Sequence, residues 1–155
     1  MIQKIPNIDD SQEKYRELIE ILGNEYAETT IESPFDFINI SKKGIRAELI
    51  SNFKSRFNIS KELTAGLLNI SEPTLYRWIK ENKILDEYLV IKILKISELF
   101  IFGIKILENK ENFFKWIDLP NISLGGYKPK QLIAYPGGIS KVRDVLGRIE
   151  HGVYS

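Results

Sequence analysis

The sequence predicts an all-α protein, and three observations lead to this prediction. Apolar residues recur at helical spacing along much of the chain. Serines that suit helix N-caps precede several of these segments, at Ser11, Ser33, Ser60, Ser71 and Ser140. One mainly apolar run exceeds twenty residues without a turn signal, which is longer than a typical strand. The expected order is a helix-turn-helix domain, a long central helix and a small, mostly helical C-terminal domain.

The composition is typical of a globular protein of 155 residues, with 43% apolar and 28% charged residues. The chain has no cysteine, which excludes disulfides, thiolate metal sites and cysteine nucleophiles. No metal-ligand spacing is present, so neither a metal nor another cofactor is predicted. The start of the chain lacks the apolar segment of a signal peptide. The most apolar run carries four charges, so we expect a cytoplasmic protein with no membrane partner: Lys92, Lys95, Glu98 and Lys105.

Charge divides the chain unevenly. Residues 1–44 carry five basic and nine acidic side chains, whereas residues 45–100 carry nine and seven, and residues 101–155 carry eight and five. A mildly basic body is compatible with nucleic-acid binding without requiring it. We divide the chain into an acidic N-terminal helical arm (1–43), a helix-turn-helix domain (44–83) and a segment that holds the central helix and the C-terminal domain (84–155).

The acidic arm predicts two helices. Ser11 is the expected cap of a helix that ends at Gly23 and places Leu18 and Leu22 on one apolar face. Ser33 and Pro34 predict the start of a second, shorter helix that ends before Gly44.

A helix-turn-helix is predicted over residues 61–80. Ala65 is small enough for two helices to cross closely, and Asn69 tolerates the left-handed conformation that the turn needs. Ile70, Leu75 and Trp78 are the expected apolar anchors of the second helix. The outward face of that helix would meet bases and phosphates in a major groove. The candidate DNA-binding residues are Ser71, Glu72, Thr74, Tyr76, Arg77 and Lys80. The alternative is a helix-turn-helix that serves packing alone.

Residues 84–109 are rich in β-branched residues and would also suit strands. We predict a helix because the run is long and has no turn, with a possible kink at Gly103. Its apolar side chains surround most of the helix, which is typical of a core or a subunit interface. We therefore expect a homodimer.

The C-terminal third carries an ordered series of short motifs. Trp116 is followed by Leu-Pro-Asn at 119–121, Leu-Gly-Gly at 124–126 and Lys-Pro-Lys-Gln-Leu-Ile at 128–133. Gly137–Gly138, Lys-Val-Arg-Asp-Val-Leu at 141–146 and the ending Gly-Arg-Ile-Glu-His-Gly-Val-Tyr-Ser complete the series. Together with the helix-turn-helix, this series resembles the bacterial antitoxins of the Xre/MbcA/ParS family, over about residues 44–155.

The resemblance implies an antitoxin of a RES-Xre type toxin–antitoxin system. Its partner would be a RES-domain toxin that consumes NAD, and the C-terminal domain would cover the toxin's active site. The helix-turn-helix would bind operator DNA of the protein's own operon. Carried over by position, toxin contact falls on Trp116, Pro120, Asn121, Leu124, Gly125, Gly126, Gly147, Arg148, Ile149, Glu150, His151, Gly152, Val153, Tyr154 and Ser155.

Two alternatives remain open at this point. Ile149, Val153 and Tyr154 would fold back on the chain's own helices if they were ordinary core residues, and Trp116 suits either role. The whole chain would be a transcriptional regulator or a partitioning-type DNA-binding protein if it had no toxin partner. An enzyme is not predicted, because His151 is the only histidine and no catalytic group of serine, histidine and acid is visible.

Overall fold

The computed structural model describes residues 8–152, and the regular secondary structure of this part of the chain is helical, as the sequence predicts. It contains no strand, and one isolated antiparallel bridge joins Arg46 to Ile84. The elements are α1 (Ile8–Leu22), the 3₁₀ turn η1 (Asn24–Tyr26), α2 (Asp36–Ser41), α3 (Glu48–Phe57), α4 (Lys61–Leu68), α5 (Glu72–Lys80), α6 (Glu87–Ile106), α7 (Lys110–Ile117), the 3₁₀ turn η2 (Ile122–Leu124), α8 (Pro129–Ile133) and α9 (Gly138–Glu150).

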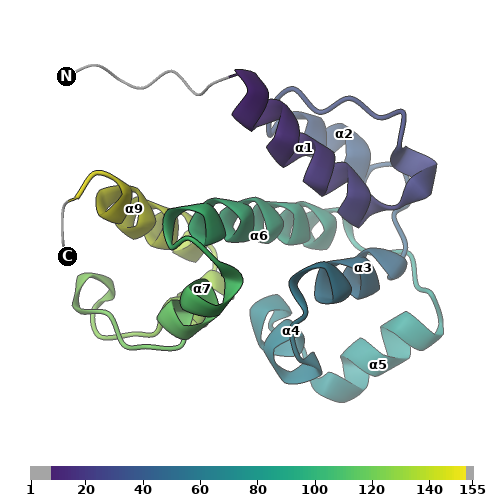
Figure 1. Cartoon of the computed structure of the whole chain (residues 1–155). Helices are drawn as coiled ribbons and strands as arrows, with labels where there is room; N and C mark the ends of the chain where they lie inside the picture. The colour runs from purple at the N-terminus through teal and green to yellow at the C-terminus, as the bar shows by residue number, and fades with distance from the viewer. Residues whose placement is uncertain (1–7, 153–155) are drawn as a thin grey trace.

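The long helix α6 forms the centre of the molecule, which confirms the predicted central helix. Figure 1 shows α1, α2 and α3 around one part of α6 and α7 and α9 around the other. Residues on several sides of α6 are fully buried: Val90, Ile93, Leu94, Ile96, Leu99 and Phe100. Because helices of the same chain cover these residues, the burial of α6 does not require a second copy. The expected dimer thus loses the reason for which it was predicted.

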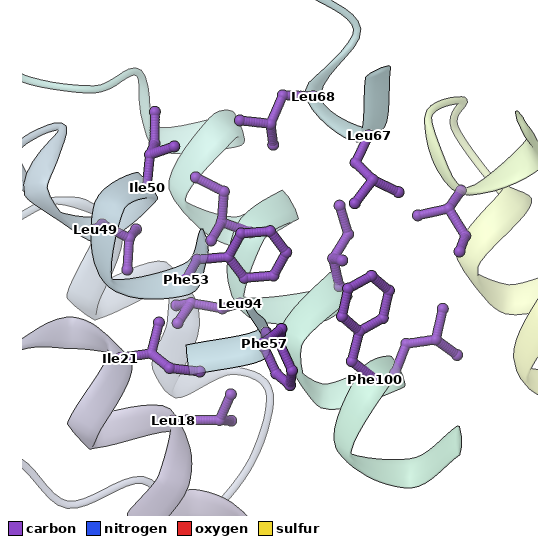
Figure 2. Close-up of a cluster of buried hydrophobic side chains, with 14 of the residues drawn as sticks. Leu18, Ile21, Leu49, Ile50, Phe53, Phe57, Leu67, Leu68, Leu94 and Phe100 are labelled. Carbon is purple, nitrogen blue, oxygen red and sulfur yellow. The ribbon is translucent and has the colours of Figure 1, made fainter. Parts of the chain in front are cut away.

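The described part of the acidic N-terminal arm (residues 8–43) contributes to this core. Leu18 and Ile21 of α1 and Phe37 of α2 are buried. Figure 2 shows Leu18 and Ile21 beside Leu49 and Phe57 of α3, with Phe100 of α6 nearby. The ring centroids of Phe57 and Phe100 are 5.1 Å apart in an edge-to-face arrangement, which is one of the arrangements that aromatic pairs prefer. One continuous hydrophobic cluster therefore includes residues from all three predicted segments.

Charged side chains of α6 also connect it to its neighbours. Glu98 lies 3.5 Å from Lys14 of α1 and 3.9 Å from Arg143 of α9, measured between nitrogen and oxygen. Lys92 Nζ donates a hydrogen bond of 2.8 Å to the carbonyl of Ala134, and partial burial lowers the pKa of this lysine. Among residues 8–152, none of the helices is apolar enough over its length to cross a bilayer.

Residues 61–80 form two short helices, α4 and α5, with the caps and the turn residue that the sequence predicts. Ser60 and Ser71 cap α4 and α5 by accepting hydrogen bonds from the backbone N–H groups of Leu63 and Thr74. Asn69 ends α4 in the left-handed region, with φ of 55°. The predicted small residue Ala65 is buried. These local signals are short-range, so the sequence shows them directly.

Gly103 has a packing role in α6. A Cβ atom at this residue would overlap the ring of Phe113 and would lie 3.2 Å from Leu146 Cδ1. The helix continues through Gly103 to Ile106, so we attribute this glycine to the close approach of α7 and α9 and not to the expected kink.

Three predicted helix features are wrong in detail. α1 begins at Ile8, before the expected cap Ser11, and α9 begins at Gly138, so Ser140 lies inside its first turn. α2 begins at Asp36 with Phe35 as its N-cap, and not at the expected start at Ser33 and Pro34. Gly and Ser near a helix start indicate its position only to within a few residues.

Candidate functional site

The segment between α7 and α8 is a tightly closed loop, which we name the Ile122 loop (residues 118–128). Asn121 organises it: its side-chain oxygen accepts a hydrogen bond of 2.9 Å from the N–H of Ser123. Its backbone carbonyl accepts from Gly126 N–H, and its own N–H donates to the carbonyl of Tyr127, at 2.9 and 3.0 Å. Gly125 and Gly126 follow with φ of 68° and 84°, which disfavours any side chain at either residue. The loop conformation is therefore held by its own backbone.

This conformation sends neighbouring side chains in opposite directions. Leu124 is buried, whereas the side chain of Ile122 is 93% exposed. Leu119 and Tyr127 are also mostly exposed, at 59% and 57%. An exposed group of large apolar side chains on an ordered loop is unusual for a surface that meets only water.

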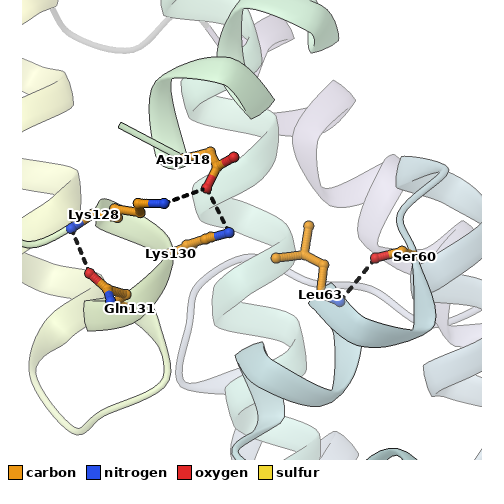
Figure 3. Close-up of polar contacts among 6 residues, drawn as sticks. All are labelled: Ser60, Leu63, Asp118, Lys128, Lys130 and Gln131. Atoms are coloured by element: carbon orange, nitrogen blue, oxygen red, sulfur yellow. Dashed lines mark hydrogen bonds and ion pairs between the residues drawn. The ribbon is translucent and has the colours of Figure 1, made fainter. Parts of the chain in front are cut away.

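Ion pairs fix the base of the Ile122 loop. Asp118 Oδ1 lies 2.6 Å from Lys130 Nζ and 3.3 Å from Lys128 Nζ, as Figure 3 shows. The hydrogen bond from Lys130, followed by that from Lys128, holds the pKa of Asp118 below its usual value. The N–H of Lys128 donates to Gln131 Oε1 at 2.9 Å, which joins the end of the loop to α8.

The fold brings the two groups of predicted toxin-contact residues together. α9 packs against η2, and Figure 1 shows the Ile122 loop and the end of α9 on the same side of the molecule. Arg148, Glu150 and His151 are exposed, and Gly152 turns the chain with φ of 73°. Ile149 is half-buried against the core, which agrees with the alternative that this residue packs on the chain's own helices. The predicted contacts at Val153, Tyr154 and Ser155 lie outside the described residues.

The other toxin-contact residues predicted from the sequence differ in how far they are exposed. Pro120, Gly125 and Gly126 are exposed and Asn121 is half-buried, so all four are accessible. Leu124 is buried, so its side chain does not form part of the surface and instead anchors the loop. Trp116 is half-buried and stacks on Phe113, with 6.5 Å between ring centroids, so it belongs partly to the aromatic core.

A groove of about 1040 Å³ separates α4 from the C-terminal region. Leu63 and Gly66 line one wall, and Tyr127 and Tyr135 line the other. Figure 3 shows Leu63 and Ser60 facing Lys130 across this space. The sequence did not predict the groove, because its walls come from segments about sixty residues apart.

The outward face of α5 presents the predicted DNA-binding residues. Ser71, Glu72, Tyr76, Arg77 and Lys80 are exposed and Thr74 is half-buried. The Ser71 hydroxyl is already bonded to the Thr74 side chain at 2.9 Å, so both residues act in the cap. Lys80 and Lys83 lie over the rings of Tyr76 and Trp78, at 5.9 and 4.5 Å from the ring centroids. Arg77 is thus the cation of this face that is best placed to reach into a groove of DNA.

Leu119, Ile122 and Tyr127 are not among the residues that the sequence motifs predict as contacts. The signal was present in Leu-Pro-Asn-Ile-Ser-Leu-Gly-Gly, because an asparagine cap followed by two glycines predicts a tight turn. It could not show which of Ile122 and Leu124 would point outward, since that depends on where α9 lies.

Residues 103–152 match the family model described as the antitoxin Xre/MbcA/ParS C-terminal toxin-binding domain. The match confirms the predicted resemblance for this part of the chain and includes the Ile122 loop and the end of α9 up to Gly152. It supports a role as the antitoxin of a toxin–antitoxin system, with a toxin protein as partner. Among curated proteins, no significant match to the chain was found.

Proposed function

With that match as the premise, we propose that the chain is an antitoxin that binds and neutralises a RES-domain, NAD-consuming toxin. The C-terminal region covers the toxin's active site, and the protein acts in the cytoplasm by binding and not by catalysis. The observation that supports this proposal most directly is the toxin-binding-domain match over residues 103–152, joined to an exposed apolar loop within that range.

We further propose that residues 44–83 bind operator DNA of the protein's own operon, so that the antitoxin represses its own synthesis. The capped α4–α5 pair and the exposed Arg77 and Lys80 support this part. The surface that α5 presents carries only a small excess of positive charge, with Glu72 and Glu81 beside its cations. In this proposal two copies bind the two half-sites of the operator, because binding both together compensates for a weak single contact; the burial of α6 plays no part in this argument.

The first test of this function is rescue from toxicity. The product of the neighbouring gene, which this proposal expects to be a RES-domain toxin, is expressed with the full chain or with a variant that ends at Glu150. This variant keeps α9 complete, since the helix ends at that residue. A variant that ends at Leu146 would also remove the half-buried Ile149 and would confuse packing with contact.

Each outcome has a distinct meaning. Rescue by the full chain alone assigns inhibition to residues 151–155, and rescue by both places it on the Ile122 loop and α9. If neither rescues while both are folded and soluble, the antitoxin proposal is wrong. The helix-turn-helix would then favour a regulator or partitioning protein without a toxin.

A further inference from the structure

We propose that Ile122 is the apolar anchor of the toxin interface and that the toxin has an apolar pocket to receive it. This inference rests on the proposed function and assigns the interface to side chains that the sequence signature did not single out. In this view Asn121, Leu124, Gly125 and Gly126 hold the loop in place, and Ile122, Leu119 and Tyr127 make the contact.

The exposure of these residues is the first reason. A β-branched apolar side chain that is 93% exposed gains nothing from folding, because it remains in water. Leu119 and Tyr127 belong to the same closed loop and are also mostly exposed, so three large apolar side chains of this loop remain in water. Several large apolar side chains exposed on one short segment indicate a protein interface more often than a single scattered residue does.

The rigidity of the loop is the second reason. Four contacts fix the segment from both sides: the cap by Asn121 Oδ1, the paired backbone of Asn121 with Gly126 and Tyr127, and the buried Leu124. A partner that binds Ile122 therefore does not have to order a flexible loop, and less affinity is lost on binding. An anchor held ready in this way is the usual form of a binding hot spot.

The charges of the loop argue for a protein partner with an apolar pocket and against nucleic acid. Its one cation, Lys128, and Lys130 of the neighbouring helix α8 are both paired with Asp118 at the base of the loop. Because Asp118 already compensates the charge of both lysines, a phosphate backbone would gain little from contact with them. The family match names the toxin as the partner of this segment, and the match is continuous across the loop.

The test uses calorimetry to measure the affinity of the full chain for the RES-domain protein expected from the neighbouring gene. That toxin carries an inactivating substitution. Ile122→Ala removes the proposed anchor, and Ile38→Ala is the matched control because Ile38 is also an exposed isoleucine, on α2. We expect Ile122→Ala to weaken binding by about ten- to a hundredfold, as expected for the loss of most of a buried isoleucine. The control should bind as the unaltered chain does, and both variants should keep its helical circular dichroism.

A second variant tests the loop conformation. Gly126 has φ of 84°, and a Cβ there would meet no other atom within 4 Å. Gly126→Ala therefore strains the loop without a clash, and it should weaken toxin binding while the rest of the fold persists. If the unaltered chain binds the toxin and Ile122→Ala binds equally well, the anchor is wrong and the antitoxin function stands. If the unaltered chain does not bind, the proposed function itself fails.

Discussion

The backbone of Gly103 in α6 lies against the ring of Phe113 in α7, so closely that a side-chain carbon at residue 103 would overlap that ring. We predict that Gly103→Ala lowers the free energy of unfolding by about 1–3 kcal/mol, the usual cost of overpacking a core. This loss exceeds the gain of about 0.5–1 kcal/mol that alanine brings to a helix interior. Urea denaturation measures the difference.

Gly66 in α4 provides the matched control. It is also inside a helix, but it is exposed and a Cβ there would have no other atom within 4 Å. Gly66→Ala should raise the free energy of unfolding by about 0.5–1 kcal/mol. Equal effects of the two substitutions would show that Gly103 is not a packing position.

Substitution of Gly147 is expected to change the stability of the chain and its toxin binding in opposite directions. It is helical, and a Cβ there would have no other atom within 4 Å, so Gly147→Ala should stabilise the isolated chain by about 0.5–1 kcal/mol. If the toxin lies against this part of α9, the added methyl group should weaken toxin binding in the same protein. A variant that is more stable and binds unchanged would remove Gly147 from the interface.

Arg77→Ala tests the DNA-binding proposal. We expect weaker binding to the operon's own promoter by about 1–3 kcal/mol if Arg77 contacts a base edge. If it contacts a phosphate, the slope of log affinity against log salt should fall by about 0.9. Mobility shifts over a salt series measure both quantities.

Lys95→Ala is the control for that experiment, since Lys95 is an exposed cation on α6 and not on α5. Identical shifts for the unaltered chain and Arg77→Ala would favour a helix-turn-helix that serves packing alone.

The pKa of Asp118 can be followed by NMR titration. Pairing with Lys130 and Lys128 lowers it from 3.8, so the folded chain holds this carboxylate charged at a pH where the unfolded chain is protonated. The stabilising contribution is therefore complete above the unfolded value and is lost as the pH falls through the lowered one. Lys130→Ala should move the pKa back towards 3.8. If the pKa of Asp118 is the same in the unaltered chain and in Lys130→Ala, the ion pair between Lys130 and Asp118 is absent in solution.

Much of the helical framework could be predicted from sequence, because its signals are local. Ser60, Ser71 and Asn69 act within one helical turn of their own position. The capped pair of helices α4 and α5 followed from such patterns. Helix starts were less certain, since α1 and α9 begin two or three residues before their expected serines.

What the sequence by itself determined is therefore the helical class, the turn at Asn69, the capped α4–α5 pair and the identity of the C-terminal motifs. Only the tertiary structure decided that α1 and α2 cover α6, that Gly103 admits Phe113, and that Ile122 points outward while Leu124 points inward. The physical reason is range. A cap or a left-handed residue acts on neighbouring backbone, whereas burial depends on which distant helix fills the space beside a side chain.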